Sequence, residues 1–420
     1  MSSHDLPAPH RPISLRTING IGRGLEALGL RLPRIDEPRL LVAAQKKTGL
    51  TNFGSSHFRT GLGILIESLE TEAKLNQLGR IVAQRQLLDL LCGRLQLFDC
   101  WERHPEIAEE KIERPLFVLG LPRTGTTILH QLLAQDPTHR TPATWEVAMP
   151  VPAPESATYN SDARIAKVDR NQQAILRLAP SFESMHPMGA RLPTECLSIT
   201  AYEFCSLQFE VCANIPSYQK WYHEQKPSEA YAFHHQFLRH LQWHCPGERW
   251  ILKTPAHLGA LESLLAEYPD ALFVQTHRDP LAIMPSISSL VYCMRCTSSD
   301  SIDGAEIGRQ QVEQWSTALD HSIQTRTEMK QRSHQFLDIY FDEVLKDSVA
   351  CARRIYTHFA LPWSAGIEVR MQSFLSDNKR HKHGVHRYTL EMFDLSPEVI
   401  EKRFAHYREH FRISQKEQER

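Results

Sequence analysis

The sequence is most informative at first through what it lacks. Its 420 residues hold no uninterrupted apolar run of the roughly 20 residues that a membrane-spanning helix needs, and residues 1–12 lack the apolar core of a signal peptide. Lys and Arg number 48 against 49 Asp and Glu, so the excess of positive charge expected of a general nucleic-acid binder is missing. The nine cysteines form no spaced framework for disulfides or zinc, even counting the pair Cys293 and Cys296. We therefore expect a cytoplasmic protein with reduced thiols, no transmembrane segment and no nucleic-acid partner.

The remaining composition predicts a folded chain with two regions. Hydrophobic residues make up 41% of the sequence, enough for a substantial core. Residues 1–114 show helical periodicity, clearest over 62–98, and we expect them to pack on the domain that follows. Short apolar runs typical of buried strands then occur at 116–119, 250–252, 271–274 and 336–340. Helical patterns separate these runs, which predicts an α/β domain over 115–420 with a largely parallel sheet, and a helical cap inserted at about 150–248.

One loop is the strongest chemical signal. Gly120-Leu-Pro-Arg-Thr-Gly-Thr-Thr127 follows the first predicted strand and opens a helix, the arrangement in which backbone N–H groups and the helix dipole bind an anion. The glycine spacing is that of a Walker A loop, yet Thr126 stands where such a loop has lysine, and the basic residue is Arg123. A nucleoside triphosphatase needs that lysine and an acid for magnesium, so the loop favours a shorter phosphosulfate over ATP or GTP.

Two further strand ends carry a cation. Lys253 closes the second predicted strand and Arg278 follows the third. Because the carboxyl ends of parallel strands meet at one edge of the sheet, both are expected beside the loop. Asp279 is a natural N-cap for a helix, and Ser286 follows Arg278 about two helical turns later.

These residues resemble the PAPS-dependent sulfotransferases, where PAPS is 3′-phosphoadenosine-5′-phosphosulfate. The likeness is strongest to a bacterial subgroup with the same Gly-Leu-Pro-Arg-Thr-Gly-Thr-Thr loop and a Leu-Lys-Thr-Pro-x-His-Leu motif, here Leu252–Leu258. The resemblance implies a P-loop-like central parallel sheet flanked by helices, with PAPS as co-substrate and no metal. It also implies that Lys253 lies against the transferring group and that Arg278 and Ser286 grip the 3′-phosphate. The residues that it assigns to the 5′-phosphosulfate are Arg123, Thr124, Gly125, Thr126 and Thr127.

The general base is where the sequence departs from the family. Cytosolic sulfotransferases carry a histidine two residues after the lysine, but Pro255 occupies that place and His257 comes two residues later. Tyrosylprotein sulfotransferases use a glutamate about two dozen residues after the loop arginine, and Glu146 lies at that distance from Arg123. We predict Glu146 as the base by a narrow margin over His257. Glu195, in the predicted cap, is interpreted as structural.

A basic run near the C-terminus extends the predicted nucleotide site. It surrounds Gly384, which allows close approach of the backbone to a ligand, and the family has a basic nucleotide-contacting segment late in the chain. Lys382 and His386 are therefore candidates for the 3′-phosphoadenosine side. No carboxylates or cysteines accompany the three histidines of this run, which argues against a metal site.

The predicted function is transfer of a sulfuryl group from PAPS to a hydroxyl of a small acceptor. Acidic and basic residues are nearly equal in number across the aromatic-rich cap, whereas a groove for a polyanionic glycan should be basic. We therefore expect a lipid-like, polyketide or aromatic alcohol in an apolar pocket. The alternatives are a nucleotide-dependent kinase of the P-loop type and a catalytically silent nucleotide-binding protein.

Overall fold

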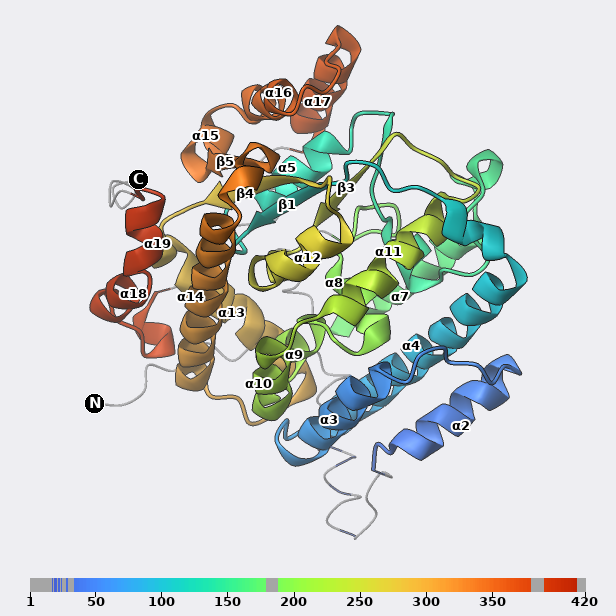
Figure 1. Cartoon of the computed structure of the whole chain (residues 1–420). Coiled ribbons are helices and arrows are strands. Elements are labelled where there is room, and N and C mark those ends of the chain that lie inside the picture. The colour runs from blue at the N-terminus through green and yellow to red at the C-terminus, as the bar shows by residue number, and fades with distance from the viewer. Residues whose placement is uncertain are drawn as a thin grey trace.

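A five-stranded parallel sheet forms the centre of the fold (Figure 1). The computed structural model of the chain describes residues 34–178, 188–378 and 389–413, with a few residues between 17 and 28. The strands are β1 (Leu116–Gly120), β2 (His139–Arg140), β3 (Arg249–Lys253), β4 (Leu272–His277) and β5 (Phe336–Tyr340), in the spatial order β2-β3-β1-β4-β5. All four neighbouring pairs are parallel. The predicted parallel α/β sheet is confirmed, and β2 is an additional strand of two residues.

Helices cover both faces of the sheet, which explains why its four longer strands contain apolar runs. Along β1, Leu116 and Val118 join one core and Phe117 and Leu119 join another. The first face is covered by α5 (Thr126–Leu133), α16 (Ser348–His358) and α17 (Ala365–Asp377). The second is covered by α11 (Ser228–Gln242), α12 (Leu261–Glu267), α13 (Pro280–Ser298) and α14 (Gly304–Glu328). Strands buried on both faces read as continuous hydrophobic runs, and those runs are the ones recognised in the sequence.

Three α-helices lie within residues 34–103 of the N-terminal region. They are α2 (Glu37–Thr48), α3 (Phe58–Thr71) and α4 (Gln77–Arg103), and Figure 1 shows them together at the far end of the molecule from α16 and α17. The periodic stretch 62–98 is split between α3 and α4 because Asn76 caps a new helix by accepting the N–H of Gly79. The buried Arg94 of α4 pairs with Glu203 of the cap, so the N-terminal helices share a core with the inserted segment.

The inserted segment is helical, as predicted. The helix α6 (Thr144–Ala148) precedes it, and its described α-helices before α11 are α7 (Ala163–Leu178), α8 (Leu197–Thr200), α9 (Gln208–Cys212) and α10 (Pro216–Glu224). The segment returns to the sheet just before α8, where the N–H of Cys196 donates to the carbonyl of Lys253 over 3.0 Å. This contact brings part of the cap to the carboxyl end of β3.

The chain ends with α15 (Phe341–Lys346), which follows β5, and with α18 (Pro397–Arg403) and α19 (Ala405–His410). Among the described residues, no helix is both long and apolar enough to cross a membrane. The same part of the chain contains no group of three or more His, Cys, Asp or Glu arranged to hold a metal ion. The nine cysteines, all within the described ranges, are free thiols.

Candidate active site

The loop between β1 and α5 has the backbone of an anion-binding turn. Gly120 and Gly125 have φ values of +137° and +92°, and a side chain at Gly120 would place its Cβ 2.2 Å from the hydroxyl of Thr276. Gly125 is also the N-cap of α5, so the first N–H groups of that helix follow directly after a left-handed residue. Arg123 is exposed on the loop and itself has φ of +69°.

Thr124 has a structural role that the sequence did not reveal. Its hydroxyl donates to the carbonyl of Leu121 over 2.6 Å and lies 2.6 Å from the hydroxyl of Thr276 on β4. The side chain is fully buried. Thr124 therefore ties the loop to the neighbouring strand, and any contact that it makes with a ligand would have to come from its backbone.

Lys253 reaches the loop from the end of β3. Its side chain is 4% exposed, and its ammonium donates to the hydroxyl of Thr127 over 3.5 Å. The ammonium also forms an ion pair with Glu195, which lies at the return of the cap to the sheet. The structure thus brings together Thr127 and Lys253, which the sequence had assigned to the site, and Glu195, which it had not. Glu195 belongs to no recognisable motif, and only the tertiary contact shows its place.

Arg278 joins the same edge of the sheet from β4. Its guanidinium donates to the backbone carbonyl of Arg123 over 3.0 Å and lies 4.0 Å above the ring of Phe341. The carboxylate of Asp279 accepts the N–H of Leu281, which confirms the predicted helix cap at the start of α13. Ser286 lies half-buried on that helix.

Glu146 has the surroundings of a structural carboxylate. One oxygen pairs with Arg140, and the other accepts the N–H of Ala143 over 2.8 Å and the hydroxyl of Tyr159 over 3.1 Å. The side chain is wholly buried, and burial raises the pKa of Glu146. Its role as general base stays a prediction, but these contacts favour stabilisation of α6 and of the segment around it.

His257 is enclosed between the sheet and α11. Its Nδ1 lies 2.7 Å from the hydroxyl of Tyr231, and its ring packs edge-on against Phe117. Within the described residues, Nε2 has no hydrogen-bond partner. Burial lowers the pKa of His257 to about 3, so the ring is neutral near pH 7.

The remaining predicted contacts, Lys382 and His386, fall in the stretch 379–388, which is outside the described residues. Their role stays a prediction.

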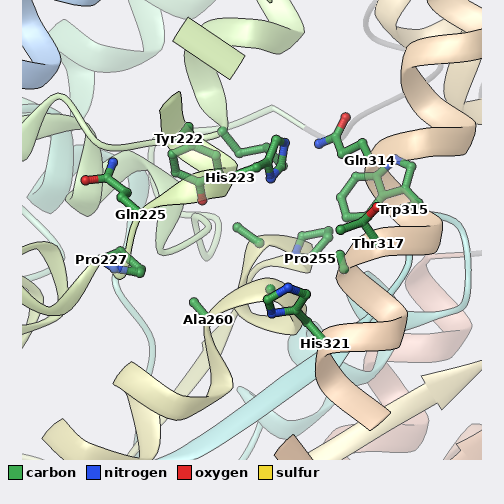
Figure 2. Close-up of a pocket in the computed structure, with 14 residues that line it drawn as sticks. Tyr222, His223, Gln225, Pro227, Pro255, Ala260, Gln314, Trp315, Thr317 and His321 are labelled. Carbon is green, nitrogen blue, oxygen red and sulfur yellow. The ribbon is translucent and has the colours of Figure 1, made fainter. Parts of the chain in front are cut away.

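An open pocket begins beside the site. It holds about 530 Å³ of empty space, its mouth included, between α10, α14 and the short 3₁₀ helix η5 (Pro255–Ala260) that follows Lys253. Figure 2 shows side chains from these three elements facing the pocket. Its lining residues are Leu207, Tyr222, His223, Gln225, Pro227, Pro255, Ala256, Gly259, Ala260, Gln314, Trp315, Thr317, Ala318 and His321. None of these is Asp, Glu, Lys or Arg.

Fold and loop together define an α/β protein of the P-loop-like class. Comparison with known proteins narrows the class, because residues 115–365 match the sequence model of the Sulfotransferase family. The chain belongs to that family.

Solved structures agree with this assignment. Sulfotransferase STF1 from Mycobacterium tuberculosis H37Rv is 32% identical with a TM-score of 0.80, over 89% of this chain and 99% of that one. Sulfotransferase STF9 from Mycobacterium avium is 30% identical with a TM-score of 0.82, over 90% of this chain and 97% of that one. Among curated proteins, the chain is similar to the omega-hydroxy-beta-dihydromenaquinone-9 sulfotransferase Stf3 of Mycobacterium bovis. The two are 23% identical over 300 residues, which cover 68% of this chain and 73% of that protein.

Proposed function

We propose that this sulfotransferase takes its sulfuryl group from PAPS and transfers it to a hydroxyl of a small hydrophobic acceptor. The observation that carries the proposal is the meeting of three groups at one edge of the sheet. These are the glycine loop that opens α5, Lys253 on the hydroxyl of Thr127, and Arg278 on the backbone of Arg123. Such an edge offers N–H groups and fixed positive charge to a phosphosulfate without a metal ion.

The roles proposed for individual residues combine this arrangement with the family resemblance, and those of Lys382 and His386 rest on the resemblance alone. The N–H groups of residues 123–127 and the ammonium of Lys253 would surround the 5′-phosphosulfate. Arg278 and Ser286 would hold the 3′-phosphate, with Lys382 and His386 on the adenosine side. Catalysis then depends on holding the acceptor oxygen in line with the sulfur and on positive charge placed where the leaving oxygen becomes negative.

The acceptor class follows from the pocket beside η5. Its lining contains no Asp, Glu, Lys or Arg and includes Trp315, Tyr222 and Leu207, which suits an apolar molecule with a few polar groups. The relative named for a menaquinone derivative also acts on a lipid-like hydroxyl compound. Both observations support a lipid-like or aromatic alcohol over a polyanionic glycan. A cytoplasmic location, in keeping with nine free thiols, is part of the same proposal.

An acceptor screen with ³⁵S-labelled PAPS tests this function. Long-chain alcohols, phenols and heparan-type oligosaccharides are compared at equal donor concentration, with EDTA present. We expect label in the hydrophobic alcohols or phenols. Preference for the oligosaccharide, or a steep loss of activity as salt rises, would contradict the acceptor class, because long-range attraction to a polyanion is screened by salt. Transfer to no acceptor, with the bisphosphate product still bound, would instead favour a silent nucleotide-binding protein.

A further inference from the structure

A carboxylate that the sequence analysis interpreted as structural contacts a residue of the proposed transfer site. Glu195 forms an ion pair with Lys253, the lysine at the end of β3. We propose that Glu195 is the general base that removes the proton from the acceptor hydroxyl. The proposal rests on the sulfotransferase function proposed above and adds a catalytic residue to it.

The position of Glu195 is fixed by its own backbone. The N–H of Cys196 donates to the carbonyl of Lys253, and the carbonyl of Glu195 accepts the N–H of Ser198 over 3.0 Å at the start of α8. The carboxylate therefore contacts the same ammonium that donates to Thr127 of the loop. A general base must lie within hydrogen-bonding reach of the proton that it takes. The ammonium of Lys253 contacts both the carboxylate of Glu195 and the hydroxyl of Thr127, so the carboxylate lies near the loop.

Exposure separates Glu195 from Glu146. The side chain of Glu195 is 17% exposed, whereas that of Glu146 is 0% exposed and has hydrogen-bond donors on both oxygens. A general base has to receive a proton from the acceptor and then return it to water in every cycle. Glu195 has a path to solvent for that second transfer, and Glu146 is sealed among Arg140, Ala143 and Tyr159.

Basicity separates Glu195 from His257. The pKa of His257 is lowered to about 3 by burial, so at pH 7 its ring is a much weaker base than an ordinary imidazole. Its Nδ1 is engaged by Tyr231 as well. The neutral ring of His257, itself part of η5, fits a packing role against Phe117 and Tyr231.

Several titratable groups lie close enough to interact with Glu195. Among the described residues they include Lys253, His257, His130 and Cys196. Burial lowers the pKa of both histidines to about 3 and raises that of Cys196 to about 12. Of these four groups, Lys253 is the one whose side chain forms an ion pair with the carboxylate of Glu195.

The step balances without another reactant. The acceptor O–H bond breaks and its proton goes to the carboxylate of Glu195, while the acceptor oxygen forms a bond to sulfur. The bond from sulfur to the bridging phosphate oxygen breaks, and its electron pair leaves with 3′,5′-adenosine bisphosphate. Lys253, between Glu195 and the loop, is placed to offset the charge that develops on the leaving oxygen. Glu195 then gives its proton to water.

The test is the pH dependence of sulfuryl transfer in Glu195→Gln, with Glu146→Gln as the matched control. For Glu195→Gln we expect kcat to fall about 10²- to 10⁴-fold, the usual contribution of a general base. Affinity for 3′,5′-adenosine bisphosphate should be unchanged, which shows that the donor site is folded. The wild-type rate should fall at acid pH as the base becomes protonated, and this fall should be absent from the residual activity of Glu195→Gln. Glu146→Gln, assayed at a temperature where the variant is folded, should still show the fall in rate at acid pH.

A purely structural role for Glu195 would not alter the response to acceptor acidity. Loss of a base matters less when the acceptor gives up its proton readily, so the defect of Glu195→Gln should be smaller for 4-nitrophenol than for phenol. Glu195→Asp keeps a carboxylate with a shorter reach and should retain the fall at acid pH with a smaller loss of kcat. A near-normal kcat in Glu195→Gln, or an equal defect with both phenols, would overturn the proposal. A wild type that binds the bisphosphate but transfers to no acceptor would contradict the proposed function instead.

Discussion

The two sides of the candidate site are assembled in different ways. On the donor side, Arg123, Lys253 and Arg278 each lie within a few residues of the end of a parallel strand, so their order along the chain already determines that they meet. Glu146 and Glu195 both lie between β1 and β3, yet Glu146 is sealed in a buried cluster and Glu195 contacts Lys253. Strand topology therefore brings Arg123, Lys253 and Arg278 to one edge, whereas only tertiary packing distinguishes the surroundings of the two carboxylates.

The largest expected effect concerns Lys253. If it stabilises charge that develops during transfer, Lys253→Ala should lower kcat by about 10²- to 10³-fold and raise the donor KM far less. Lys226 is a matched control, because it is an exposed cap lysine paired with Glu262, and such surface pairs contribute little. Steady-state kinetics of both variants decide the point. A rise in KM with unchanged kcat would make Lys253 a binding residue only.

The next prediction tests whether Glu146 belongs to the scaffold. Glu146→Gln leaves the buried guanidinium of Arg140 without its counter-charge, so we expect a loss of about 3 kcal/mol in the free energy of unfolding. Chemical denaturation measures this loss, and kcat at a temperature where the variant is folded should stay near that of the wild type. Unchanged stability combined with abolished turnover would return the role of base to Glu146.

The third prediction tests whether Arg278 binds the 3′-phosphate of the donor. Arg278→Ala removes a charge-assisted contact worth about 1.5–3 kcal/mol, so affinity for 3′,5′-adenosine bisphosphate should fall about 10- to 150-fold. Adenosine 5′-phosphosulfate, which lacks the 3′-phosphate, should be a poor donor for the wild type and should lose little more in the variant. Equal affinity of variant and wild type for the bisphosphate, measured by calorimetry, would remove the assignment.

The last prediction, whose effect is the smallest when counted per pH unit, concerns the buried cap beside the pocket. Burial raises the pKa of Glu210 from 4.5 to about 8. Between pH 4.5 and pH 8 the carboxyl group is therefore protonated in the folded state and ionised in the unfolded state. Stability from this group is therefore present at pH 4.5 and lost towards pH 8, by up to about 1.4 kcal/mol per pH unit. Glu210→Gln should flatten that part of the stability curve, whereas Glu229→Gln, at an exposed site of α11, should follow the wild type. Parallel curves for all three proteins would contradict the prediction.

Elements of the fold could be predicted from the sequence where they have a clear hydrophobic pattern. The apolar runs of β1, β3, β4 and β5 contribute to the cores on both sides of the sheet, and all four were found. Strand β2 has only two residues, His139 and Arg140, and carries no such pattern. The break between α3 and α4 depends on one capping residue, Asn76, within a continuous periodic stretch.

The site was predictable where a motif coincides with a strand end. The sequence pointed to Lys253 and to the loop. It did not reveal that the hydroxyl of Thr124 donates to the carbonyl of Leu121 and also contacts the hydroxyl of Thr276 on β4. The position of Glu195 could not be predicted from the sequence, because its contact with Lys253 joins residues 58 positions apart. That contact forms only where the cap comes back to the sheet. Local spacing identifies anion sites, and long-range packing decides which side chains face them.

The most direct test of the donor site is a thermal shift of the wild-type protein with 3′,5′-adenosine bisphosphate, with ATP and magnesium, and without ligand. A ligand present at 100 times its Kd stabilises the folded state by about 2.7 kcal/mol, which gives a measurable rise in Tm. The proposed function predicts that the bisphosphate raises Tm in the presence of EDTA and that ATP with magnesium does not. A rise with ATP and magnesium alone would contradict it and favour a kinase.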